Sequence, residues 1–176
     1  MKLKSLFKIA VDAGIAADPR SRKMIEKDLK RVEDRHKRIE GKERDHIDHE
    51  RTWNPYLDSR ILVGTGEEEV KVVMVGIDIE TPELLLAYEL KRMGRRLDAV
   101  MFHHPEGRAL ADLEKVMPVQ IDVLAKAGVP VNQAEGMLRP RMDKIWRSIH
   151  ADNLFRTERA AELLGIPLFG CHTVAD

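Results

Sequence analysis

The sequence predicts an α/β domain with a partly parallel sheet, flanking helices and a charged helical segment at its N-terminus. One observation is that a strand pattern, a helical pattern and a second strand pattern follow one another between residues 70 and 102, which is the order of a βαβ unit. Another is that the preceding residues show helical periodicity and many charges. We therefore expect a helical extension over residues 1–58, packed on the core or projecting from it, and an α/β domain over residues 59–176.

The composition excludes several classes of function. The 176 residues include 30 basic and 30 acidic side chains, so no net charge draws the chain to nucleic acid or to a membrane. A single cysteine, Cys171, excludes an internal disulfide framework and a multi-cysteine zinc site. No apolar run reaches the length of a membrane span, and the N-terminus lacks the apolar stretch of a secretory signal. We expect a cytoplasmic protein without a membrane partner.

Two helices are predicted in the N-terminal segment. Apolar residues recur at helical spacing over residues 2–14, and Ser21 is a candidate N-cap for a second helix over residues 22–40. Basic and acidic residues are interleaved in the second helix, which favours ion pairs on a solvated face over a nucleic-acid interface.

Histidines and carboxylates also occur at metal-ligand spacing within residues 45–50, where His46 and Glu50 would share one helical face. A metal site usually lies in a partly dry pocket, and this segment has almost no apolar neighbours. We therefore interpret it as a solvated turn or helix end.

The next part of the chain contains the βαβ unit. Strands are predicted at residues 60–64 and 70–77, and the short turn between them suggests a hairpin. A helix then begins with Thr81 as its N-cap and ends at Gly94, and another strand covers residues 97–102.

Polar side chains follow both strands that flank this helix. Asp78 comes after one strand, and His103 and His104 come after the other. Because strands joined by a crossover helix are parallel and end at the same edge of a sheet, we expect these three side chains to lie near one another. That edge is where α/β sheets bind their ligands.

The remaining residues are predicted to be helical up to one last strand. The predicted elements are helices over residues 108–128 (with a break at Pro118), 137–150 and 154–164 (with Asn153 as N-cap and Gly165 as stop), an extended piece over residues 129–132 and a strand over residues 166–171. Two more polar residues, His172 and Asp176, follow this strand.

Histidines and carboxylates at strand ends suit a divalent transition metal such as zinc, iron or manganese. Two imidazoles and one carboxylate leave a coordination position open for water, and a carboxylate such as Asp176 can bridge two ions. Such a centre would support metal-dependent hydrolysis. The alternatives are that His103 is a half-buried core residue, His104 a loop residue and His172 a satisfied polar residue.

Three motifs carry a resemblance to a known family. They are Gly76-Ile77-Asp78-Ile79 before a helix, Asp98-Ala99-Val100-Met101-Phe102-His103-His104-Pro105, and His172-Thr173-x-x-Asp176. In order and spacing they resemble the NGG-one-interacting-factor-three-like family, also labelled GTP cyclohydrolase 1 type 2, over residues from about 60 to 176. The resemblance implies an α/β fold with a two-metal centre at one sheet edge and an oligomeric assembly. It also implies that His103, His104 and Asp176 are metal ligands and that His172 lies beside them; Asp78 is a further candidate there.

The family completes its centre with a His-x-x-x-Glu motif in a C-terminal half. Here the only such spacing joins His46 to Glu50, before the site, and we interpret it as a coincidence. We therefore expect a short or truncated member that corresponds to the N-terminal half of the family fold, or one whose missing ligands come from elsewhere. A three-ligand centre would hold one or two ions less tightly, or none.

Two functions follow from these patterns. The first is a metal-binding, hydrolase-like protein that acts through metal-activated water. The alternative is a non-catalytic protein-interaction or regulatory module that binds a protein partner or forms a homo-oligomer. The residues identify no substrate, and because they include no phosphate-binding loop they give the cyclohydrolase label no support.

Overall fold

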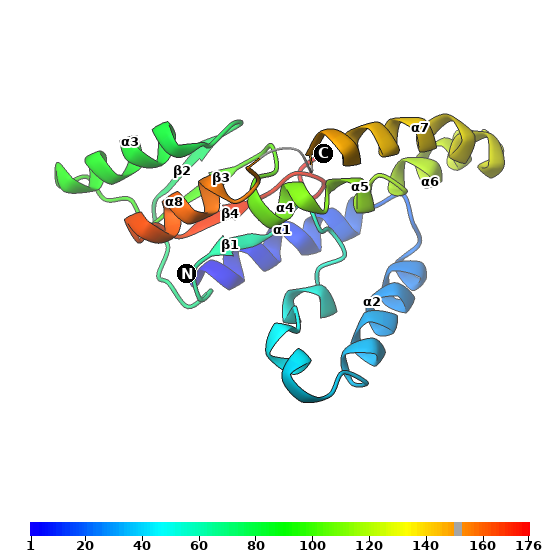
Figure 1. Cartoon of the computed structure of the whole chain (residues 1–176), viewed down its shortest axis with the longest axis horizontal. Coiled ribbons are helices and arrows are strands. Elements are labelled where there is room, and N and C mark those ends of the chain that lie inside the picture. Colours follow the sequence, from blue (N-terminus) through cyan, green and yellow to red (C-terminus); the bar gives the residue numbers. More distant parts are fainter. Residues whose placement is uncertain (150–152) are drawn as a thin grey trace.

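A four-stranded mixed sheet forms the centre of the computed structural model, which describes residues 1–149 and 153–176 (Figure 1). The strands are arranged in the order β1-β4-β3-β2, and their bounds are Ile61–Val63 (β1), Val73–Gly76 (β2), Ala99–Phe102 (β3) and Leu168–Gly170 (β4). β2, β3 and β4 are parallel, while β1 runs antiparallel to β4. The predicted α/β class with a partly parallel sheet is therefore confirmed.

The predicted hairpin between the first two strands is wrong, because β1 pairs with β4 and β2 pairs with β3. The connecting residues bind the N-terminus of the chain instead. The Leu3 amide donates to the Glu68 carbonyl, and the Val70 amide donates to the Met1 carbonyl. The connecting residues 64–72, held by this contact, run from β1 at one edge of the sheet to β2 at the other.

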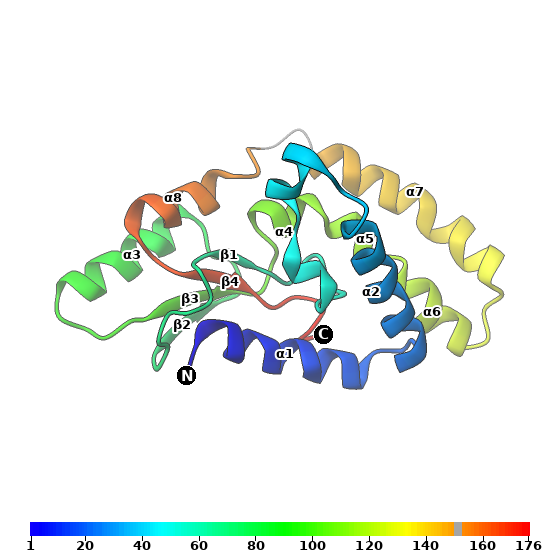
Figure 2. The same cartoon turned by 90° about the horizontal axis from the view of Figure 1, so that it is seen from below.

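Helices cover both faces of the sheet (Figures 1 and 2). On one face lies α1 (Leu3–Ala17), whose Phe7 and Val11 pack with Ala99 and Phe169. On the other lie α3 (Thr81–Arg92), α4 (Gly107–Ala111) and α8 (Arg156–Leu164), which pack against Val100, Phe102 and Leu168. Neighbouring residues of β3 thus contribute to opposite cores, as expected for a strand that is buried on both faces.

The N-terminal segment continues beyond α1 as a polar arm. It comprises α2 (Arg22–His36) and two 3-10 helices, Gly41–His46 (η1) and His49–Thr52 (η2). As predicted, Ser21 caps α2 by accepting a hydrogen bond from the Met24 amide, and ion pairs such as Lys37–Glu33 lie on its solvated face. The division of the chain at residue 58 stays a prediction, although α1 contributes directly to the core.

Residues 45–50 do not form one helical face. His46 ends η1 and His49 begins η2, and both are exposed. Glu50 instead accepts a hydrogen bond from the Asn54 side chain, and its carboxylate lies 3.4 Å from Nε of buried Arg60. Glu50 therefore serves to anchor this loop, and within the described residues the His46–Glu50 spacing builds no metal site.

Several helix boundaries differ from the predictions. The long helix predicted after His104 is three short ones, α4, α5 (Leu113–Val116) and α6 (Val119–Lys126), broken at Asp112 as well as before Pro118. The extended piece predicted at residues 129–132 is wrong, because α7 (Val131–Ile149) has already begun there; residue 150 lies outside the described residues. Together α6 and α7 form a helical hairpin beside the sheet (Figure 1).

Two predicted N-caps are also wrong. The N-cap of α3 is Glu80 rather than Thr81, because Glu80 and Glu83 form a capping box. α8 begins after Phe155 rather than after Asn153, because the intervening residues form a turn. Its predicted end is confirmed at Gly165, which has the left-handed φ of 63° that glycine tolerates best. No helix in the described part of the chain is long and apolar enough to cross a membrane.

Close packing between β3 and β4 leaves room only for glycine at residue 170. A Cβ atom there would overlap the ring of Phe102, which is fully buried and has no space to move into. We expect Gly170→Ala to lower the free energy of unfolding by about 1–3 kcal/mol, the usual cost of overpacking a core. Urea unfolding followed by circular dichroism would measure this change.

The matched control is Gly136→Ala, on the exposed surface of α7, where an added Cβ meets nothing within 4 Å. This change should be neutral or stabilise the fold by up to about 1 kcal/mol, because alanine is the better helix former. Equal effects of the two substitutions would contradict the close packing of Phe102 on Gly170.

Candidate metal centre

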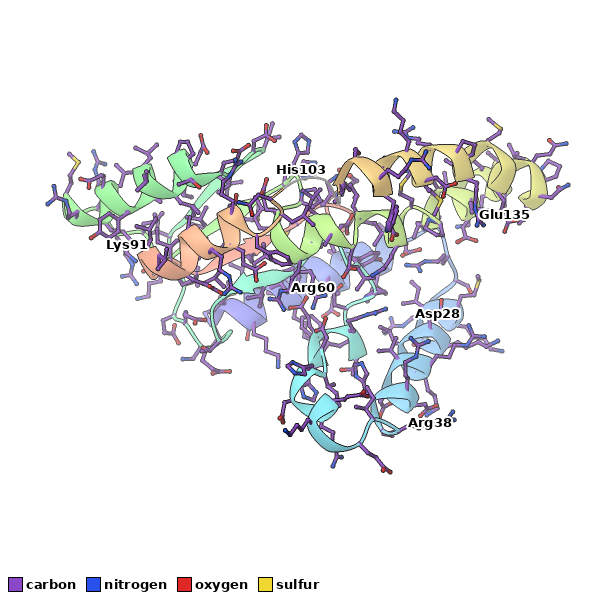
Figure 3. All side chains as sticks on the ribbon, in the orientation of Figure 1. Asp28, Arg38, Arg60, Lys91, His103 and Glu135 are labelled. Carbon is purple, nitrogen blue, oxygen red and sulfur yellow. The ribbon has the colours of Figure 1, made fainter. Side chains whose placement is uncertain are left out.

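The carboxyl ends of β3 and β4 bring the predicted site residues of two separate motifs together. His103, labelled in Figure 3, follows β3 directly. His172 lies two residues beyond β4. The two strand ends are joined by a hydrogen bond from the Cys171 amide to the Phe102 carbonyl, 3.0 Å long. The imidazole centroids of His103 and His172 are consequently 5.0 Å apart.

Asp176 completes a group of three side chains with metal-ligand chemistry. A tight turn after β4, in which the Asp176 amide donates to the His172 carbonyl, returns the chain toward the strand end. The carboxylate oxygens of Asp176 lie 3.6 Å from Nε2 of His103 and 3.8 Å from Nε2 of His172. One ligand atom from each of these residues lies within 4.8 Å of the others.

His104 and Asp78 lie at the border of this group. The His104 ring is 5.3 Å from the His103 ring, and its Nδ1 is 2.7 Å from a carboxylate oxygen of Asp78. The expected proximity of Asp78 to the histidine pair is thus observed. The resemblance made His104 a ligand and His172 its neighbour, whereas the grouped ligand atoms belong to His103, His172 and Asp176. Which of the two histidines binds a metal stays a prediction.

A buried carboxylate that the sequence reasoning missed holds His172. Asp58 is fully buried and accepts hydrogen bonds from Nδ1 of His172 at 2.8 Å and from the Thr173 hydroxyl at 2.5 Å. The neighbouring Ser59 hydroxyl accepts from the His172 amide. Asp58 comes just before β1, and β1 pairs with β4, the strand that precedes His172. The contact could therefore have been inferred only from a correct prediction of this strand pairing.

His103, His104 and His172 each use Nδ1 for an anchoring contact. Nδ1 of His103 lies 3.0 Å from the Cys171 carbonyl, while Nδ1 of His172 and of His104 face Asp58 and Asp78. A carbonyl can only accept, so Nδ1 of His103 must carry the proton, which leaves Nε2 as the metal-binding nitrogen of the neutral ring. Histidines that bind metals usually donate their other nitrogen to a carbonyl or carboxylate in this way. The donor set therefore fits a divalent transition metal.

The electrostatics of two further groups bear on this chemistry. The hydrogen bond from Asp58 raises the pKa of His172 above its ordinary value, although burial opposes this shift. Burial raises the pKa of the Cys171 thiol to about 11, so this residue is a neutral thiol at pH 7 and a poor metal ligand.

A cavity of about 430 Å³ opens beside the group. Its lining comes from the end of α1, from Tyr56 and from α5 and α6, and it includes His172 and Asp176. The site is thus accessible to a small molecule.

One solved structure resembles this chain over most of its length. No family model matches the sequence, and no curated protein matches it. The crystal structure of a NIF3 superfamily protein from Sphaerobacter thermophilus is similar with a TM-score of 0.60 and 29% sequence identity. The match covers 68% of this chain and 42% of that protein, so this chain spans less than half the length of the protein it resembles.

The contact between Asp58 and His172 predicts a pH-dependent effect. In metal-free protein, Asp58→Asn keeps a hydrogen-bond acceptor but removes the charge, so the pKa of His172 should fall. Because the folded-state pKa of His172 is raised, the pair stabilises the fold fully below the unfolded pKa of about 6.5 and loses this contribution as the pH rises through the folded pKa. The variant should therefore lose more stability, relative to the wild type, at about pH 5 than at about pH 8.

The pKa is measured by NMR titration of the His172 ring, and the stability by urea unfolding at both pH values. Asp12→Asn, which removes an exposed carboxylate paired with Lys8, is the control and should leave the His172 titration unchanged. An unaltered His172 pKa in Asp58→Asn would contradict the charge interaction.

Proposed function

Because this chain resembles a NIF3 superfamily protein in fold and sequence, we propose that it is a metal-binding, hydrolase-like protein whose centre is formed by His103, His172 and Asp176, with His104 beside them. The observation that carries the proposal is that each of the three histidines has its Nδ1 anchored and its Nε2 left for a metal. Zinc, iron and manganese all suit two imidazoles and a carboxylate.

The chain's own residues would position the reacting groups. Asp58 fixes the ring orientation of His172, and the Cys171 carbonyl fixes that of His103. Asp176 is the exposed member of the group and faces both rings, so its carboxylate can bind one ion or bridge two. A divalent ion held there would act as a Lewis acid and make water a nucleophile at neutral pH. His104, whose Nδ1 is engaged by Asp78, would supply the ligand for a second ion.

Metal content tests this proposal directly. Protein incubated with zinc and then dialysed should retain one or two ions per chain by plasma mass spectrometry. His103→Ala should lose most of this metal because it removes a ligand, while His104→Ala should halve the content if two ions bind and leave it unchanged if one binds. Circular dichroism would verify that each variant folds.

The matched control replaces two of the histidines that precede the site, His46→Ala with His49→Ala. Both are exposed on the 3-10 helices, so their removal should leave the metal content at the wild-type value. Retention of metal by His103→Ala, or its loss from the control, would refute the assignment of the centre.

Protein association is a second candidate function, and one surface supports it. β2 lies at an edge of the sheet, where one side of a strand's backbone is open to pairing. Val75 and Ile77 are 61% and 63% exposed there, and Leu85 and Leu86 are exposed on the adjoining α3. An apolar edge strand is an unusual feature for a monomer. We infer that a second copy of this chain pairs with it, because two identical edge strands can pair antiparallel about a two-fold axis.

The oligomeric state tests this second candidate. Sedimentation equilibrium of the wild type should give a concentration-dependent dimer, and Val75→Lys should shift it to the monomer because the charge cannot be buried at the pairing edge. Met137→Lys, at an exposed position of α7, is the control and should dimerise like the wild type. A monomeric wild type at all concentrations, or a dimer in Val75→Lys, would remove the support for β2 as an interface.

A further inference from the structure

We propose that the cavity beside the metal centre binds a small molecule with an apolar body and a single polar head, and that it excludes compounds with several phosphate groups. This inference rests on the proposed function, because it assigns the substrate class of that same centre. Three observations support it: the residues that line the cavity, the partners of the acids among them, and the hydrogen bonds of the first amides of α6.

The lining of the cavity combines apolar side chains with candidate metal ligands. Val116, Met117, Val119 and Val123 line it from α5, α6 and the turn between them, and Ala17 lines it from the end of α1. His172 and Asp176 line it as well. A ligand would therefore place its apolar part between the helices and its polar head at the metal ligands.

The charged residues that line the cavity are all acids, and each already has a partner. Asp18 binds Nη2 of Arg20 at 2.7 Å and accepts a hydrogen bond from the Tyr56 hydroxyl, also at 2.7 Å. Asp58 holds His172 and Thr173, and Asp176 faces the imidazoles. With Asp176 engaged by a bound metal ion, no carboxylate of the lining would be left to select a cationic ligand.

Lysine and arginine are absent from the described residues that line the cavity, whose one basic side chain is His172. Arg20 lies next to one wall, but its guanidinium is committed to Asp18 through two hydrogen bonds from side-chain nitrogens. Proteins recognise phosphate groups with arginine or lysine, so a phosphate chain in this cavity would face three acids with only His172 and a bound metal to compensate their charge.

Helix α6 does not replace the missing cations. Val119 and Gln120 at its start line the cavity, and a helix start can bind phosphate through free amides. Here the Gln120 amide donates to the Met117 carbonyl and the Ile121 amide donates to the Pro118 carbonyl. These first amides are therefore used within the turn, which leaves apolar contact as the main interaction that the cavity offers.

The volume sets a limit on the size of the ligand. About 430 Å³ lies toward the low end of the range for small-molecule sites. This volume suits a compact molecule, such as an aliphatic or aromatic ester or amide whose carbonyl is the polar head.

Binding of a neutral dye tests the cavity independently of catalysis. The fluorescence of N-phenyl-1-naphthylamine should rise saturably on titration with the full-length protein, with and without zinc, and millimolar GTP should not displace the dye. Val123→Glu should weaken dye binding by about tenfold or more, because it places a charge in the apolar wall. Val123 is 49% exposed, so the substitution does not disturb a buried core.

Ile9→Glu is the matched control, since Ile9 is also a β-branched residue on a helix, is 57% exposed and lies outside the cavity. It should bind the dye as the wild type does. An equal loss of affinity in both variants, no loss in Val123→Glu, or displacement of the dye by GTP would overturn the inference.

Hydrolysis by the zinc-loaded protein separates this inference from the proposed function. Turnover of p-nitrophenyl butyrate in preference to p-nitrophenyl phosphate would support both. Dye binding that depends on Val123, without turnover of either ester, would refute the hydrolytic function and still support the apolar cavity. Turnover of p-nitrophenyl phosphate alone, without dye binding, would overturn the cavity inference and leave the hydrolytic function supported.

Discussion

Phe102 and Gly170 lie side by side in the parallel pair β3·β4, with the phenyl ring where a side chain at residue 170 would stand. This close approach fits only a register in which Phe102 and Gly170 are neighbours. The same register determines which residues after the two strands come close to each other. Since His103 follows Phe102 and His172 lies two residues after Gly170, both imidazoles reach the same sheet edge. A register shift of one residue would displace one strand end along the other by about 3.3 Å and so change the distance between the two imidazoles. The candidate metal centre thus depends on a packing contact in the core.

The anchoring of the histidines comes from parts of the chain that share only this sheet edge. Asp58 precedes β1, Asp78 follows β2 by two residues, and the Cys171 carbonyl belongs to the segment after β4. Each contact fixes a ring before any ligand arrives, so less conformational entropy is lost when a metal binds. Asp176, by contrast, is exposed and lies at the end of a turn, where it can adjust to one ion or to two.

Sequence reasoning found the elements that depend on local pattern. Periodicity located the strands that carry Asp78 and His103, and the crossover rule correctly made them parallel, because such a connection leaves little choice of direction. The sequence reasoning failed where the structure depends on contacts between residues that are far apart in the sequence. The false hairpin arose because the pairing of Met1 and Leu3 with residues 68–70 is not visible in local pattern. Asp58 was missed for the same reason, since its partner His172 is 114 residues away.

The position of β4 in the middle of the sheet also has a consequence for how the molecule folds. β2, α3 and β3 are contiguous in sequence and can associate early, but β1 and β3 each need β4 as a neighbour. The hydrogen bond between Ser59 and His172 joins residues that are 113 positions apart. Contacts of such long range form slowly, and until they form the edges of β1 and β3 are free to pair with other chains. During synthesis, the histidines therefore come together only after β4 has left the ribosome, so the candidate centre forms later than the unit of β2, α3 and β3.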